Sequence, residues 1–384
     1  MTARFPDEAH RTSTPLELFF DLCFVVAVSQ ASTQLHHALA ADDGWWGPLH
    51  FLLVFFAIWW AWMNFTWFAS AYDNDDVLYR LVTLVEITGA LILAAGIPEA
   101  FSAADFTTVF VGYLVLRLGL VIQWLRAAHD DPPGRGADRR YAAGVSMCMV
   151  GWFVVLLLGW PLWGWFVMAA MELTVPLWAE RGATTAWHPG HIAERYGLFT
   201  LIVLGESVLS STVAVQFALD RHRNPADVYL IAVGGLLTVF AMWWLYFAKP
   251  AHSLLTSNRV AFVWGYGHYI VFGSAAAVGA GIAVNVDRAT QSGHAGAGEV
   301  SALAAGAAIS VPVALFLVAV WALHVRPHHS GRVWDALFPV TAVVVLAVGF
   351  TAQPVLAVGL VLALLTGASI AITAQYGVGS VTPE

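Results

Sequence analysis

Residues 47–70 read GPLHFLLVFFAIWWAWMNFTWFAS and contain no Asp, Glu, Lys or Arg. Wound as an α-helix, a stretch of this length spans the hydrocarbon core of a bilayer, which takes about 20 mainly apolar residues. The same character extends along the chain, because 59% of its 384 residues are hydrophobic and only 11% are charged. An ordinary soluble domain has about 25% charged residues. The composition therefore predicts an all-α integral membrane protein without a separate soluble catalytic domain.

The apolar runs divide the chain into about twelve candidate spans. Two pairs of spans are separated only by tight hairpins, at residues 159–161 and 351–354, where a Pro interrupts a long apolar run. Merging the helices at both hairpins would leave ten spans, which is the alternative count. The predicted spans are residues 16–38, 47–70, 78–97, 106–126, 141–159, 162–179, 196–217, 228–248, 260–284, 300–324, 333–350 and 353–375.

The basic residues are distributed unevenly between the two sides of the predicted helices. With twelve spans, 13 of the 17 Lys and Arg residues fall on the side of the N-terminus. The opposite side holds only Arg221, Arg223 and Arg288, and Arg117 falls inside the fourth span. Loops rich in Lys and Arg stay in the cytoplasm. We therefore expect both termini on the cytoplasmic side.

The N-terminal region loosely imitates a secretory signal, because Arg4 and Arg11 precede the apolar residues 16–28. Glu17 and Asp21 lie inside that apolar stretch, however, and a signal tolerates charges poorly there. We therefore expect the first span to remain in the mature protein.

The two groups of six spans resemble each other at an offset of about half the chain. Ala94 to Ile97 recurs as Gly279 to Ile282, and a Trp pair occurs in the second span of each group. We therefore predict two parallel six-helix repeats, residues 1–190 and 191–384, related by a pseudo-twofold axis with a pathway between them. Chance similarity among apolar helices is the alternative.

Several charged residues fall inside the predicted spans, where each costs about 2.5 to 3.5 kcal/mol or more. Glu17 and Asp21 are four residues apart and share one face of the first helix. Arg117 cannot lose its charge, and Asp21, Glu86 and Glu206 are its candidate partners. We expect these residues to form a titratable network. The alternative is an Asp that only fixes helix packing through one Arg.

His268 is a weaker candidate, because a lone His among aromatic residues more often packs than carries protons. Glu172 lies near the inner end of its span and is expected to reach the headgroups without a functional role. His188 and His191 are placed in a loop and set aside. Cys23 and Cys148 lie in apolar runs, so we expect neither a disulfide nor a metal cluster.

The usual motifs of other functional classes are missing from the sequence. It has no phosphate-binding glycine loop, no serine-nucleophile elbow and no paired-histidine protease helix. It also lacks a basic patch for nucleic acid. The expected partners are the lipid bilayer and a small solute or proton, with no cofactor and no nucleic acid. The residues indicate no particular oligomeric state.

Two segments carry a resemblance to a known family. PLELFFDLCFV at residues 15–25 resembles the ELFFDLVFV signature of the bacterial low temperature requirement protein A (LtrA) family, and HIAERYGLFTLIVLGES at residues 191–207 resembles its second signature. Cys23 and Tyr196 depart from the usual Val and Phe without removing a charge. The resemblance implies a multi-pass protein of the bacterial inner membrane. It places these residues in the signatures: Glu17, Phe19, Phe20, Asp21, Glu194, Arg195, Gly205, Glu206 and Ser207.

These observations lead to two functional hypotheses. The first is a secondary transporter or ion-coupled permease in which Asp21, Glu86, Arg117 and Glu206 line a central cavity and the driving ion is a proton. The second is a non-transporting sensor or a lipid-acting membrane enzyme whose buried charges only hold the helices together. The family name links the chain to growth in the cold but supplies no chemistry.

Overall fold

The chain is almost entirely helical. The computed structural model describes residues 3–4, 11–41, 44–182, 184–220, 225–291, 300–329 and 331–377. Across these ranges no strand occurs, and eleven helices are long and apolar enough to cross a membrane. A twelfth helix, α12, has 17 residues, fewer than the usual 20. The predicted all-α membrane class is therefore confirmed.

Each span predicted from hydropathy corresponds to one helix, except that residues 300–324 cover an α-helix and the π-helical turn that continues it. The helices of the first half are α1 (Pro15–Ala40), α2 (Trp46–Tyr72), α3 (Val77–Ser102), α4 (Thr107–Asp130), α5 (Arg135–Leu157) and α6 (Leu162–Ala179). Those of the second half are α7 (Pro189–Asp220), α8 (Pro225–Phe247), η1 (His252–Leu254), α9 (Asn258–Gln291), α10 (Ala302–Val320), η2 (Trp321–Val325), α11 (Arg326–His328), α12 (Arg332–Val348) and α13 (Pro354–Gly377).

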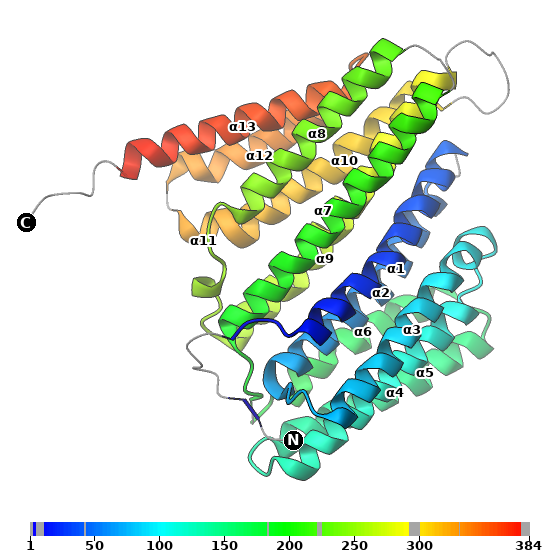
Figure 1. Cartoon of the computed structure of the whole chain (residues 1–384), viewed down its shortest axis with the longest axis vertical. Coiled ribbons are helices and arrows are strands. Elements are labelled where there is room, and N and C mark those ends of the chain that lie inside the picture. The colour runs from blue at the N-terminus through cyan, green and yellow to red at the C-terminus, as the bar shows by residue number, and fades with distance from the viewer. Residues whose placement is uncertain are drawn as a thin grey trace, which may run out of the picture. The chain divides into compact units, whose positions relative to one another are not determined.

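The chain divides into two compact units. Unit 1 comprises residues 1–34 and 45–202, and unit 2 comprises residues 35–44 and 203–384. Two of the three divisions fall inside α1 and inside α7, which are continuous helices in Figure 1, and the third falls between α1 and α2. Each of these two helices therefore contributes residues to both units.

In unit 1, the helices α3, α4 and α5 pack side by side, and α6 packs against α5 (Figure 1). Helix α2 is buried over most of its length. The crossing of α3 and α4 is close because glycines meet there: a Cβ on Gly112 would lie 2.2 Å from the backbone nitrogen of Leu93. Small residues let membrane helices approach in this way. Any larger residue at Gly112 would push α3 and α4 apart.

In unit 2, α9 packs against α10, and α13 packs against α8 and α12. The contact of α9 with α10 again depends on a glycine, because a Cβ on Gly281 would lie 2.2 Å from the carbonyl oxygen of Ala308. The contact of α8 with α13 is also close at Gly234, which faces the backbone of Leu356. Direct backbone contact thus positions both of these helix pairs.

Both tight hairpins separate two helices. Between α5 and α6 the backbone turns through Gly159 and Trp160, whose φ angles are 73° and 58°. Pro161 then precedes the first residue of α6. Between α12 and α13, residues 349–353 leave the helix before Pro354 starts the next one. The merging of each pair into one helix, on which the ten-span alternative depends, is therefore not found.

Candidate functional site

The first turn of α1 is built around Glu17. Thr14 precedes the helix and Pro15 opens it, a position that suits proline because its missing N–H needs no partner there. The Thr14 backbone N–H donates to Glu17 Oε2 at 2.8 Å, and the Glu17 N–H donates to Thr14 Oγ1 at 3.3 Å. This reciprocal pair is a capping box. It fixes the Glu17 carboxylate at the start of the helix.

Glu17 and Asp21 share one face of α1 and meet the first turns of α7. Arg195 Nε donates to Asp21 Oδ2 at 3.0 Å, and Arg195 Nη1 lies 3.0 Å from Glu17 Oε1. His191, one turn before Arg195, places Nε2 3.1 Å from the same Glu17 oxygen. All four side chains are fully buried. The fork of one guanidinium thus joins both carboxylates.

Aromatic side chains close off this cluster. Trp62 of α2 donates its indole N–H to Asp21 Oδ1 at 2.7 Å. The Arg195 guanidinium carbon lies 5.8 Å from the centre of the Phe65 ring, which stacks on Phe20 at 3.8 Å. Cation–π contact of this kind favours a desolvated arginine. The buried guanidinium is therefore held by two carboxylates and by an aromatic face.

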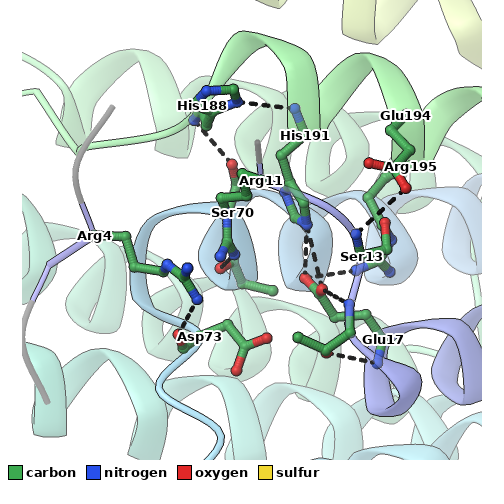
Figure 2. Close-up of polar contacts among 12 residues, drawn as sticks. Arg4, Arg11, Ser13, Glu17, Ser70, Asp73, His188, His191, Glu194 and Arg195 are labelled. Carbon is green, nitrogen blue, oxygen red and sulfur yellow. Dashed lines mark hydrogen bonds and ion pairs between the residues drawn. The ribbon is translucent and has the colours of Figure 1, made fainter. Parts of the chain in front are cut away.

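The segment before α1 forms hydrogen bonds with α2 and α7 at the same end of unit 1, as Figure 2 shows. Arg11 Nη2 donates to the Ala69 carbonyl at 2.7 Å, and the Ser13 N–H donates to Glu194 Oε1 at 3.3 Å. Arg4 Nη1 donates to the Asp73 carbonyl at 3.2 Å. Burial raises the pKa of the Asp73 carboxyl to about 6, and the negative charge of Glu17 adds to the effect.

A second buried cluster surrounds Glu172 of α6. Arg117 of α4 places Nη2 3.2 Å from Glu172 Oε2 and also donates to the Tyr113 hydroxyl. Tyr113 donates to Glu172 Oε1 at 2.9 Å, and the indole N–H groups of Trp60 and Trp152 reach the carboxylate at 2.8 and 3.2 Å. Side chains from α2, α4, α5 and α6 therefore converge on one carboxylate.

Glu86 of α3 is buried without such partners. It is 1% exposed, and neither carboxylate oxygen has a hydrogen-bond partner within the described residues. Its side chain lies against Gly119 of α4, where a Cβ would come within 2.4 Å of Glu86 Cγ. Arg117 is close enough to act on it electrostatically. The same guanidinium keeps Nε and Nη1 without hydrogen bonds inside the described part of the chain.

In unit 2, Glu206 and Ser207 of α7 face different partners. Glu206 is 3% exposed and accepts a hydrogen bond from Ser210 at 2.6 Å. Ser207 donates to the Ala275 carbonyl of α9 at 2.7 Å, where Gly279 makes room for it. A Cβ on Gly205, in contrast, would meet no atom of the described region within 4 Å. Ser207 therefore joins α7 to α9.

His268 of α9 is held in a buried polar and aromatic group in unit 2. Its Nδ1 lies 2.7 Å from the Trp264 carbonyl, and its Nε2 lies 3.0 Å from the Tyr246 hydroxyl. The carbonyl accepts only, so Nδ1 carries the proton and Nε2 accepts from Tyr246. His324 Nε2 lies 3.5 Å away. His268 thus has the satisfied hydrogen bonds of a packing residue.

The structure corrects three expectations about these charges. The acidic partner of Arg117 is Glu172, not Asp21, Glu86 or Glu206. Glu172 does not reach the headgroups, because it is 1% exposed and lies among the donors that point at it. Asp21 pairs with Arg195 instead. Sequence distance carries no information on which helices pack together, so these partners could not be ranked from the residues.

The positions of His191 and Arg195 also differ from expectation. Hydropathy puts both residues before the seventh span, but α7 begins at Pro189 and both lie inside it, fully buried. The proline at the helix start was the available signal.

The signature residues differ from one another in burial: Phe20 is buried, whereas Phe19 is 47% exposed. Glu194 binds the segment before α1.

Comparison with known proteins gives the chain a family. The sequence profile of the bacterial low temperature requirement A protein (LtrA) family matches residues 12–370, which include both buried clusters of unit 1. An uncharacterized protein of Rhizobium meliloti (strain 1021) is 27% identical over 285 residues, or 67% of this chain. The alignment spans about 65% of that relative's length. Because the profile extends over nearly the whole chain, the protein belongs to the bacterial low temperature requirement A family.

Proposed function

We propose that this protein is a secondary transporter or ion-coupled permease of the bacterial inner membrane, driven by protons. The observation that carries the proposal is Glu86, a carboxyl in the interior of unit 1 that no described side chain or backbone group hydrogen-bonds. An ionised carboxylate without a partner is costly to bury, so Glu86 requires a proton or a passing cation as its partner.

Arg117 connects Glu86 to the rest of unit 1. When Glu86 is ionised, the permanent charge of Arg117 is attracted both to Glu86 and to Glu172. When Glu86 is protonated, only Glu172 attracts it. A proton on Glu86 would therefore change how firmly α4 is held to α6. This is the two-state element through which proton binding shifts a conformational equilibrium.

The remaining candidates have supporting roles in this proposal. Glu17, Asp21 and Arg195 fasten the start of α7 to α1, and release of this cluster would free α7 to move. Unit 2 has two buried polar pairs that could bind a solute or a proton. They are Glu206 with Ser210, and His268 with Tyr246. In this proposal the coupled proton binds to the carboxylate of Glu86.

The proposal is tested by proton flux and by direct detection of the proton. Proteoliposomes that contain the wild-type protein are loaded with a pH dye and given a potassium diffusion potential. We expect proton flux to change the internal pH, and we expect Glu86→Gln to abolish most of this flux. Glu99→Gln is the matched control, because Glu99 lies on the same helix but is exposed. Infrared difference spectra should show a carboxylic acid band that Glu86→Gln removes. A wild type without flux and without the band would refute the proposal.

A non-transporting sensor or lipid-acting enzyme is the second candidate, and the saturated clusters favour it. Glu172 receives four donors, and Asp21 receives Arg195 and Trp62. Charges paired this completely hold helices together without needing to titrate. Under this hypothesis Glu172→Gln and Asp21→Asn lower the thermal stability of the protein. The wild-type protein shows no proton flux, so Glu86→Gln has no flux to change.

We also propose that α12 is a twelfth span and that the chain consists of two six-helix repeats, residues 1–190 and 191–384. The contacts between successive helices support this, since α8, α9, α10, α12 and α13 follow one another in the same order as α2, α3, α4, α5 and α6, although α8 packs much more closely against α13 than α2 does against α6. Gly96 and Gly281, which the repeat aligns, both lie in close helix crossings. The basic loops support cytoplasmic termini.

A further inference from the structure

Unit 2 contains a large pocket at one end of its helices. Its volume is about 570 Å³, within the range of ligand sites. The pocket lies where α8 ends, beside the π-helical turn η2, where α12 begins and near the end of α13. Its walls are mostly apolar and include Trp244, Phe338 and Ile370. Trp244 and Ile370 are 45% and 46% exposed, so the pocket offers uncovered apolar surface.

The polar groups of the pocket are basic or uncharged. Lys249 and the imidazoles of His324 and His329 line it, and no acidic residue is among the described residues that do so. Lys249 forms no ion pair with any carboxylate in the described ranges. Burial and the positive charge of Lys249 lower the pKa of His329. Lys249 therefore gives the pocket a positive charge that no described lining residue balances and that an anion would neutralise.

Two buried polar atoms at the pocket lack partners within the described chain: His324 Nδ1 and Ser369 Oγ. His324 is 3% exposed and lies in η2, a π-helical turn in which the Arg326 N–H donates to the Trp321 carbonyl. Such turns cost helix stability and often occur at functional sites. The π turn and the two buried polar atoms without partners both point to a ligand at this pocket.

We propose that this pocket binds one anionic phospholipid from the inner leaflet. The phosphate of the headgroup is bound by Lys249 and His329, and an acyl chain lies along Trp244, Phe338 and Ile370. Apolar walls of this extent do not suit a small soluble anion, whereas a basic pocket between helices at the cytoplasmic face suits a lipid headgroup. The choice of leaflet rests on the proposed orientation. It does not depend on transport or on Glu86.

The test uses the full-length protein in detergent after removal of lipid. Dioleoyl phosphatidylglycerol and dioleoyl phosphatidylcholine are added separately, and native mass spectrometry counts the bound molecules. We expect one phosphatidylglycerol to bind in preference to phosphatidylcholine. Lys249→Ala should weaken its binding about fivefold, because one basic residue near a membrane surface contributes on the order of 1 kcal/mol. Lys249→Gln should do the same.

Matched variants separate the pocket from the general surface. Ala374→Trp should abolish lipid binding, because Ala374 lines the pocket, whereas Ala371→Trp, three residues earlier and outside its lining, should not. Arg259→Ala removes an exposed charge elsewhere in unit 2 and should leave binding unchanged. Equal binding of the two lipids, or equal behaviour of the two Trp variants, would overturn the proposal. Competition by glycerol phosphate as strong as by the lipid would instead identify a small-anion site and overturn it too.

Discussion

Arg195 and Asp21 lie 174 positions apart in the chain, and Arg195 Nε donates to Asp21 Oδ2 at 3.0 Å with both side chains fully buried. Because both side chains are buried, water cannot replace either partner when the other is removed. Arg195→Ala should therefore lower the free energy of unfolding by about 3 to 5 kcal/mol, because two carboxylates would remain buried without their cation. Thermal unfolding in detergent measures this loss.

Arg195→Lys is the sharper variant. An ammonium group keeps the charge but cannot form the planar fork that reaches Asp21 and Glu17 together. We expect most of the loss seen with Arg195→Ala to persist. A lysine variant as stable as wild type would mean that charge alone, without the fork, holds α1 to α7.

The same substitution should change stability much more at Glu172 than at Glu86. Glu172→Gln removes the charge that pairs with Arg117 and should destabilise the protein by about 3 kcal/mol or more. Glu86→Gln removes no described hydrogen bond and should change stability by less than about 1 kcal/mol. Comparing the two melting curves checks this, and equal losses would assign Glu86 a structural partner.

The stability of the protein should fall as the pH rises through the pKa of Asp73. Burial raises that pKa to about 6 from an ordinary value of 3.8. The unfolded chain therefore loses this proton at lower pH than the folded one, so the contribution is complete below about pH 4 and is lost above pH 6. The loss is on the order of 1 to 3 kcal/mol.

Asp73→Asn isolates this contribution. The amide keeps an oxygen for the Asp75 N–H, which donates to Asp73 Oδ1 at 3.0 Å, but it cannot ionise. At pH 7.5 the variant should unfold at a higher temperature than wild type, and the difference should disappear at pH 4. The prediction fails if the two proteins show the same dependence on pH between these values.

The proposed orientation can be measured by cysteine labelling. In a Cys23→Ala, Cys148→Ala background, Ala103→Cys should react with an impermeant maleimide in intact cells, because the turn after α3 is expected outside. Arg259→Cys, at the start of α9, should react only after lysis. Both positions are exposed, so access rather than burial decides the result. The reverse pattern would invert the topology.

Local periodicity and hydropathy predict those features of the protein that depend on neighbouring residues alone. Glu17 and Asp21 share a face of α1 because they are four residues apart, and both side chains are fully buried there, although only Asp21 is expected from the sequence to lie deeper than the interface. Hydropathy puts Arg195 outside its helix because the first turns of α7 are polar, and it does not distinguish polar residues in water from polar residues buried in protein. The contact between Arg117 and Glu172 depends on the packing of α4 and α6, which no local pattern encodes.

Glu17 links the folding of a helix end to the electrostatics of the protein interior. The same carboxylate that accepts the Thr14 amide also contacts Arg195 and His191. Any event that neutralises or displaces it would weaken both the cap of α1 and the contacts of α1 with α7. A disturbance at one side chain would therefore reach two segments that are far apart along the polypeptide.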